Sequence, residues 1–161
     1  PVVESELAFV IKDRLTGPGI TVADVIRATD FVLPAIEIAD FRVARAAGMD
    51  VRDITADMGA AGGAVLGVNA VSLNDIDILS VNSSLIINGE ERAKGVASEV
   101  LGNPVSAVAW LANKLSEFGV ALEPGQVILS GAMHNAQPVE AGDHVLARFD
   151  NGLGDIKLSF S

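Results

Sequence analysis

Apolar segments of strand length recur along the chain and are separated by short turn sequences, a pattern typical of a β-rich protein. Asn88-Gly89 is a strong hairpin signal, so a strand is expected to begin near Glu90 and to pair with the segment before the turn. The other predicted strands cover residues 2–11, 31–40, 76–87, 127–130, 144–150 and 155–160.

Helical periodicity is clearest between Asn103, the expected N-cap, and Gly119, the expected end of the helix. Pro104 suits the first helical position, because its missing N–H would have no partner there. The buried face of this predicted helix, residues 104–118, consists of Val105, Val108, Leu111, Ala112, Leu115 and Phe118.

A shorter helix is predicted over residues 22–29, where Thr21 and Asp24 resemble a capping box. Residues 42–57 show no clear pattern, and the Gly- and Ala-rich residues 57–67 predict a loop. Many short strands with two helices indicate a β-rich α+β fold, in which a mixed sheet is rolled up or packed as a sandwich. The length fits one domain over residues 1–161.

The composition narrows the possible partners. The formal net charge of −10 argues against nucleic acid and against an anionic membrane surface, since both require clustered Lys and Arg. The absence of cysteine excludes disulfides, thiolate metal sites and cysteine nucleophiles. No apolar run has the length of a membrane span and no signal peptide is visible, which is compatible with a cytoplasmic location. An acidic protein that handles an anionic substrate needs a local positive charge, and a bound cation is one source of it.

Candidate chemistry lies in the first two predicted strands. Glu4 and Glu6 share one face of a strand, with Cα atoms about 6.6 Å apart, so both carboxylates can lean onto one ion. Glu37 lies between Ile36 and Ile38 in the second strand, where a buried carboxylate requires a cation or a shifted pKa. Three carboxylates without cysteine favour Mg²⁺ or Mn²⁺. The alternative, an ordinary solvated strand face, stays open on pattern alone.

The two histidines carry weaker signals. His134 follows a predicted strand and could act as an acid or base, because an unperturbed imidazole titrates near neutrality. The commoner interpretation is a solvated histidine in a polar loop. His144 opens a predicted strand, and no role is assigned to it.

The order of motifs resembles the catalytic domain of the fumarylacetoacetate hydrolase superfamily, in its 2-oxopent-4-enoate (2-hydroxypentadienoate) hydratase and 4-oxalocrotonate decarboxylase branch. Residues 3–9 resemble the family's Glu-x-Glu strand, and residues 34–42 resemble the strand that carries its third ligand. Further matching segments are residues 17–19, 24–25, 28–30, 55–57, 101–104, 109–112, 127–132 and 141–143.

The resemblance implies a role for seven residues. Glu4, Glu6 and Glu37 correspond to the metal ligands, for Mg²⁺ or Mn²⁺. The implied catalytic set is Asp40, Arg42, Asp57 and Ser130. Arg42 is expected either to pair with Asp40 or to meet a substrate carboxylate, and a plain surface ion pair is the alternative.

Some positions depart from the family. Residues 58–61, Met-Gly-Ala-Ala, replace the polar residues expected after Asp57, and Phe41 replaces a small residue. The family's N-terminal region, with a lysine in a Lys-x-Gly setting, is not matched, so that region was lost or the chain is a fragment of a longer parent.

Three functions follow from the resemblance. The first is a hydratase of 2-hydroxy-2,4-dienoates, in the meta-cleavage catabolism of aromatic compounds. The second is a 2-oxo-3-enedioate decarboxylase, and the third is an inactive fragment or partner subunit. The residues around Trp110 read closer to hydratases, which favours hydration. The substrate class is a small 2-oxo or 2-hydroxydienoic acid. The strongly apolar composition predicts a homo-oligomer, and a hydratase–decarboxylase complex is a further expectation.

Overall fold

The first sheet is built around the long, apolar strand β1. The structure is a computed structural model that describes residues 1–43, 48 and 50–161. Strand β1 (Val2–Ile11) pairs with β2 (Thr29–Ala39), and β2 pairs with β3 (Ala61–Leu66). On its other edge β1 pairs with two short strands, β6 (Val127–Leu129) and β7 (Gln137–Pro138). β1 is therefore the central strand of this sheet.

The second sheet has the order β5-β4-β8-β9. Strands β4 (Asn82–Ile87) and β5 (Glu90–Val96) form the hairpin predicted at Asn88-Gly89, where both turn residues have positive φ. Strands β8 (His144–Phe149) and β9 (Gly154–Ser159) complete it. Pairings between the described strands of both sheets are antiparallel, in place of the mixed sheet that was expected.

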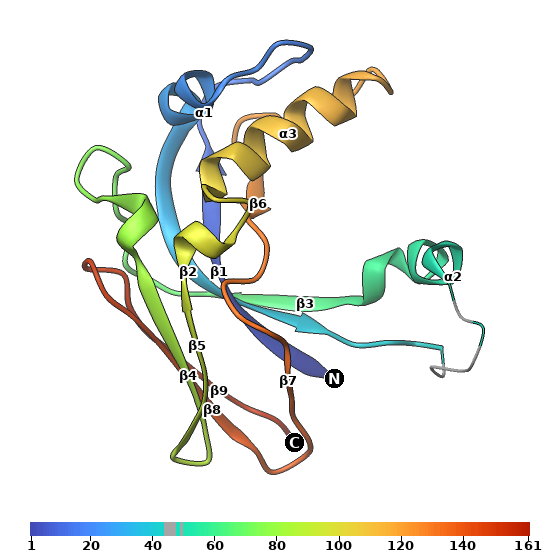
Figure 1. Ribbon diagram of the computed structural model, residues 1–161, viewed down its shortest axis with the longest axis vertical. Helices are drawn as coiled ribbons and strands as arrows, with labels where there is room; N and C mark the ends of the chain where they lie inside the picture. Colours follow the sequence, from blue (N-terminus) through green and yellow to red (C-terminus); the bar gives the residue numbers. More distant parts are fainter. Residues whose placement is uncertain (44–47, 49) are drawn as a thin grey trace.

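The apolar core joins the two sheets to the helices. Inward-facing side chains of β1, including Val3, Leu7 and Phe9, belong to one cluster with Leu85 of β4 and Val145 of β8. Helices α1 (Val22–Ala28) and α3 (Pro104–Ser116) lie together at one end of the sheets, and their buried faces extend the same cluster (Figure 1). The β-rich α+β class is confirmed. None of the described helices is long and apolar enough to cross a membrane.

The helix ends follow the local sequence. Thr21 and Asp24 form the predicted capping box of α1, and the Asn103 side chain accepts the Val105 N–H at the start of α3. Phe118 was expected on the buried face of α3, but this is wrong: the helix ends at Ser116 and Phe118 is 72% exposed.

Two further expectations need correction. Residues 57–67 are not a loop, because they form the 3-10 turn η1 (Met58–Ala60) and then β3, which pairs along the edge of β2. The strand expected from residue 76 begins only at Asn82, after the 3-10 turn η2 (Ile78–Ser80). A further 3-10 turn, η3 (Ala97–Glu99), follows β5. Asp77 accepts the Leu79 N–H and so holds the chain in the η2 turn.

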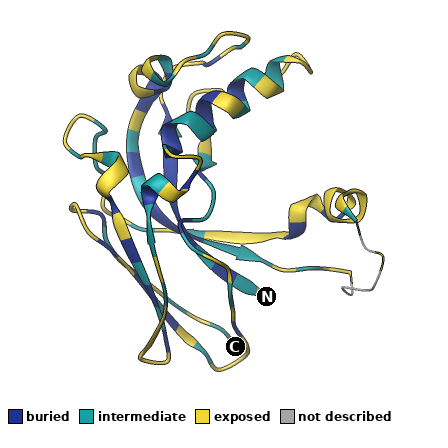
Figure 2. Cartoon of the chain, in the orientation of Figure 1, coloured by how far each residue is buried: buried dark blue, intermediate teal, exposed yellow. Residues whose placement is uncertain are grey.

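The unassigned stretch 42–57 contains helix α2 (Val51–Ala56), while residues 44–47 and 49 lie outside the described residues. The outer end of β2, together with β3 and α2, extends away from the rest of the molecule and is here called the arm (Figure 1). Most of β3 and α2 is exposed (Figure 2).

Candidate metal centre

Strand register brings the three predicted acidic residues together. Glu4 and Glu37 are direct partners in the antiparallel ladder between β1 and β2, and Glu6 lies two residues further along the same face of β1. One carboxylate oxygen from each lies within 4.8 Å of the others. β1 and β2 are joined through α1 by residues 12–28, so the cluster forms by pairing of strands that are distant in sequence.

The cluster concentrates negative charge in a poorly solvated place. Glu6 is only 2% exposed, and Glu4 and Glu37 are half-buried. Burial, a hydrogen bond to Glu37 and the charges of Glu37 and Glu4 raise the pKa of Glu6 to about 8, against the lowering effect of the Gly131 N–H. Burial and the charge of Glu37 also raise the pKa of Glu4. Like charges directly opposite each other in a sheet are destabilising. Ionised carboxylates in this cluster therefore need a compensating positive charge.

The donor set fits a hard divalent cation. Among the described residues, no lysine, arginine or histidine forms an ion pair with these carboxylates. Oxygen ligands bound to one Mg²⁺ lie at most about 4.2 Å apart, and those on one Ca²⁺ at most about 5 Å. The observed spread is near these limits, so small side-chain rotations suffice to gather the three oxygens around one ion.

Arg42, which is half exposed, forms a separate ion pair with the buried carboxylate of Asp57. The Arg42 Nε donates to Asp57 Oδ1 at 2.8 Å, and the Arg42 backbone N–H donates to Oδ2 at 3.1 Å. The guanidinium also reaches the carbonyl oxygens of Asp57 and Ala61, at 2.6 and 2.9 Å. The expected Arg42–Asp40 pair is therefore wrong, and Asp40 is exposed, with its carboxylate 3.6 Å from the amino group of Pro1. Arg42 and Asp57 therefore hold together the outer end of the arm, where the chain leaves β2 and where α2 ends.

Ser130 is buried, and its hydroxyl is used by the backbone. Its Oγ accepts the Leu7 N–H at 3.3 Å and donates to the Gly131 carbonyl at 3.2 Å. Both contacts hold the chain beside β1. The next residue, Gly131, has φ of +104°, and its N–H donates to Glu6 Oε2 at 2.8 Å. Gly131 therefore touches the acidic cluster directly, whereas sequence reasoning selected its neighbour.

His134 is not the solvated loop residue favoured by sequence. Its Nε2 lies 3.2 Å from the Ser5 backbone nitrogen, and its Nδ1 lies 3.0 Å from the Asn135 carbonyl oxygen. No local pattern marks this contact, because the two residues are 129 positions apart.

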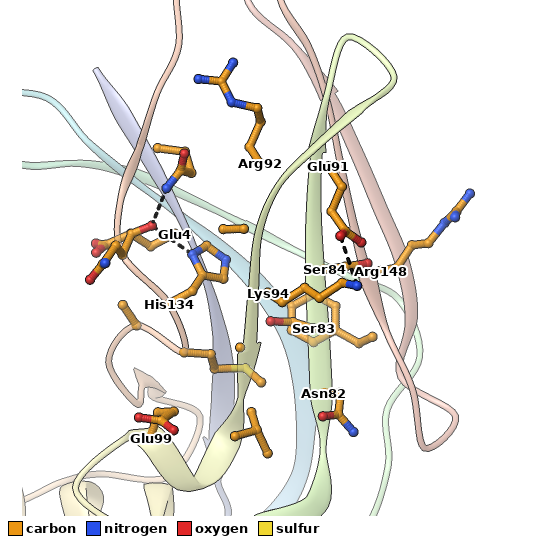
Figure 3. A pocket seen from close by; sticks show the side chains of 18 of the residues that line it. Glu4, Asn82, Ser83, Ser84, Glu91, Arg92, Lys94, Glu99, His134 and Arg148 are labelled. Carbon is orange, nitrogen blue, oxygen red and sulfur yellow. Dashed lines mark hydrogen bonds and ion pairs between the residues drawn. The ribbon is translucent and has the colours of Figure 1, made fainter.

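A cavity of about 1330 Å³ opens beside Glu4 and His134 and extends to β4, β5 and β8. Figure 3 shows Arg92, Lys94 and Arg148 around it, on the side of the second sheet. Lys94 pairs with Glu91 at 3.0 Å, and Arg148 lies 3.8 Å from Asp155. Arg92 has no ion-pair partner within the part of the chain that the structure describes. The lining of the cavity therefore holds both cationic and acidic side chains, and Glu4 of the acidic cluster is one of them.

Comparison with known proteins agrees with this architecture. The 2-oxo-hept-4-ene-1,7-dioate hydratase of Escherichia coli is 38% identical over 99% of this chain and 61% of its own length. The 4-oxalocrotonate decarboxylase of Pseudomonas putida is 35% identical over 99% of this chain and 60% of its own. The solved structure of 4-oxalocrotonate decarboxylase from Pseudomonas putida G7, complexed with magnesium and adipate, superposes with a TM-score of 0.94 at 34% identity, over 99% of this chain and 60% of that one.

The chain thus spans about three-fifths of the length of these relatives. A second structure of the same decarboxylase is complexed with calcium and acetate, at a TM-score of 0.91. The model of the fumarylacetoacetate (FAA) hydrolase C-terminal family matches residues 1–160. The chain belongs to the fumarylacetoacetate hydrolase C-terminal family.

Proposed function

We propose that this chain forms the metal-binding part of a Mg²⁺- or Mn²⁺-dependent lyase that adds water to a 2-hydroxy-2,4-dienoate (2-oxo-4-enoate), giving a 4-hydroxy-2-oxo acid. The observation that carries the proposal is the cluster of Glu4, Glu6 and Glu37 within 4.8 Å. It is supported by relatives named as hydratases, among them the 2-hydroxyhexa-2,4-dienoate hydratase of Comamonas testosteroni, at 37% identity over the whole chain.

The chemistry assigned to each group follows from its surroundings. A bound divalent cation supplies Lewis acidity, which stabilises negative charge that develops on a substrate oxygen. Glu4, Glu6 and Glu37 would hold that cation, and the Gly131 N–H fixes one oxygen of Glu6. Arg42 and Asp57 stabilise the arm beside β2. Asp40, exposed just after the end of β2, is the more accessible of the two acids in the predicted catalytic set, and its carboxylate lies 3.6 Å from the Pro1 amino group.

A decarboxylase of a 2-oxo-3-enedioate is the second candidate. It is favoured by the close superposition on the decarboxylase complexed with magnesium and adipate. A cation held by the three glutamates would suit both reactions, because hydration and loss of CO₂ both develop negative charge on a substrate oxygen that such a cation would stabilise. A small anionic substrate also suits the cationic side chains around the cavity. Assembly as a homo-oligomer, or with a partner enzyme, stays a prediction.

The test uses freshly prepared 2-hydroxypenta-2,4-dienoate with Mg²⁺, supplied to the purified chain and to the longest parent protein that contains it. Loss of the diene absorbance with formation of 4-hydroxy-2-oxopentanoate is expected, and the Glu37→Gln variant should show neither. An untouched dienoate together with release of CO₂ from 2-oxohex-3-enedioate would replace hydration by decarboxylation. Metal binding without either reaction, in the parent as well, would indicate an inactive partner subunit.

A further inference from the structure

The edge of β1 opposite β2 is not continuously paired with a strand. Strand β6 ends at Leu129, opposite Ala8, and β7 begins at Gln137, opposite Val3. Between these points the chain leaves the ladder, although this stretch of β1 carries Glu4 and Glu6. The residues concerned, 130–134, are here named the clamp segment.

The clamp segment satisfies the backbone of β1 with two side chains. Leu7 and Ser5 each donate a backbone N–H, to Ser130 Oγ at 3.3 Å and to His134 Nε2 at 3.2 Å. Their carbonyl groups accept the N–H groups of Ser130 and Met133, both at 2.9 Å. A hydroxyl and an imidazole nitrogen thus replace two carbonyl oxygens of a missing strand, which frees the Gly131 N–H to point at Glu6.

The partners of His134 determine its tautomer. The Ser5 amide is always a donor, so Nε2 must carry a lone pair and no proton. The Asn135 carbonyl is always an acceptor, so the proton lies on Nδ1. The Ser5 N–H belongs to the peptide that joins Glu4 to Ser5, and Ser5 is fully buried. An unsatisfied N–H at this place would have to turn or move, and the adjacent Glu4 and Glu6 would move with it.

The clamp segment is also held from its other side. Met133 is buried, and a Cβ placed on Gly95 of β5 would lie 2.0 Å from the Met133 carbonyl oxygen. The two backbones therefore touch, so the clamp segment is fixed between β1 and the second sheet. This contact holds the backbone next to His134 in place beside β1.

We infer that His134 is a positioning residue for the metal centre, acting as a neutral hydrogen-bond acceptor that holds the Glu4–Ser5 peptide and so sets the separation of Glu4 and Glu6. The inference rests on the proposed function, because it assigns His134 to the same metal site. Groups that orient metal ligands typically affect metal affinity by about 10–100-fold when they are removed. For His134, one peptide removed from the carboxylates, a loss near the lower limit is expected.

The experiment compares two replacements that differ in reach. The His134→Gln side chain can place an acceptor oxygen where Nε2 lies, whereas His134→Asn reaches only the position of Nδ1. Calorimetric titration with Mg²⁺ and Mn²⁺ should show about a 10-fold weaker Kd for the Asn variant and near wild-type affinity for the Gln variant. His144→Asn is the matched control, since His144 contacts Ser159 Oγ on the second sheet at 2.8 Å and should not affect the Kd.

The outcomes distinguish failure of the proposed metal centre from failure of the inference about His134. Wild-type protein that binds neither ion overturns the proposed metal centre and the inference with it. Binding by wild type with an unchanged Kd for His134→Asn, or an equal loss for Asn and Gln variants, overturns the inference alone. If the Asn variant does not fold, ¹⁵N NMR of the wild-type imidazole decides: a proton on Nδ1 with a bare Nε2 supports the inference, and a protonated Nε2 refutes it.

Discussion

Glu6 and Asp57 are both buried acids, with exposures of 2% and 7%, but their surroundings differ. Asp57 receives the Arg42 Nε and backbone N–H within its own chain. Glu6 receives the Gly131 N–H, shares a hydrogen bond with Glu37 and faces two further carboxylates, and its pKa is raised to about 8. Asp57 obtains a positive charge from Arg42, whereas none of the described residues forms an ion pair with Glu6. We therefore propose that an oxygen-loving cation supplies this charge to Glu6.

The largest expected effect concerns the cation itself. Glu37→Gln should weaken Mg²⁺ binding by more than about 100-fold, because loss of a direct ligand exceeds the effect of removing a group that only orients one. Isothermal titration calorimetry measures the Kd. Glu90→Gln, in the exposed β4–β5 hairpin, is the control and should bind as wild type does. Equal affinity of the Glu37→Gln variant and wild type would show that Glu37 is not a ligand of the bound ion.

A second effect is the pH dependence of the metal-free protein. The pKa of Glu6 is raised from the ordinary 4.5 to about 8, so the folded state favours the protonated carboxyl. Stability from this group is fully present below about pH 4.5 and is lost as the pH rises through about 8. Urea unfolding in the presence of a chelator should therefore show a midpoint that falls between about pH 4.5 and about pH 8.

Glu6→Gln should flatten this pH dependence, because the amide cannot ionise while its oxygen still accepts the Gly131 N–H. Excess Mg²⁺ should restore the stability of the wild type at high pH, since an ion that binds only the folded state stabilises it. Identical pH profiles for the chelated wild type and the Glu6→Gln variant would show that the cluster carries no unfavourable charge.

The smallest expected effect concerns Asp57 and its ion pair with Arg42. Arg42→Met leaves the buried Asp57 carboxylate without its guanidinium, which should lower the free energy of unfolding by about 1.5–3 kcal/mol. Arg52→Met removes the exposed Arg52–Asp50 pair and should leave the free energy of unfolding nearly unchanged, because solvent screens exposed pairs. Urea unfolding of both variants gives the two values. A similar loss for both would place the Arg42–Asp57 pair among ordinary surface pairs.

Several features follow from the local sequence because short-range physics governs them. The spacing of Glu4 and Glu6 puts both on one strand face, Asn88-Gly89 makes the hairpin turn, and Asn103 with Pro104 starts α3. Each depends on backbone geometry within a few residues. The fold class, predicted from the succession of short strands and two helices, is confirmed. The roles of Asp40, Arg42, Asp57 and Ser130 were implied only by the family resemblance and stay predictions.

Other features were decided only by contacts between distant segments. Residues 61–66 have little β propensity of their own, yet they form β3 because the free edge of β2 offers unpaired backbone groups. Arg42 pairs with Asp57 rather than with Asp40, because η1 and β3 turn the chain back beside β2. The β1–β2 register likewise decides that Glu37 lies opposite Glu4. The backbone N–H of Ser5 meets His134, which is 129 positions away in the sequence. Periodicity determines which face a side chain occupies, whereas only tertiary packing determines what it meets there.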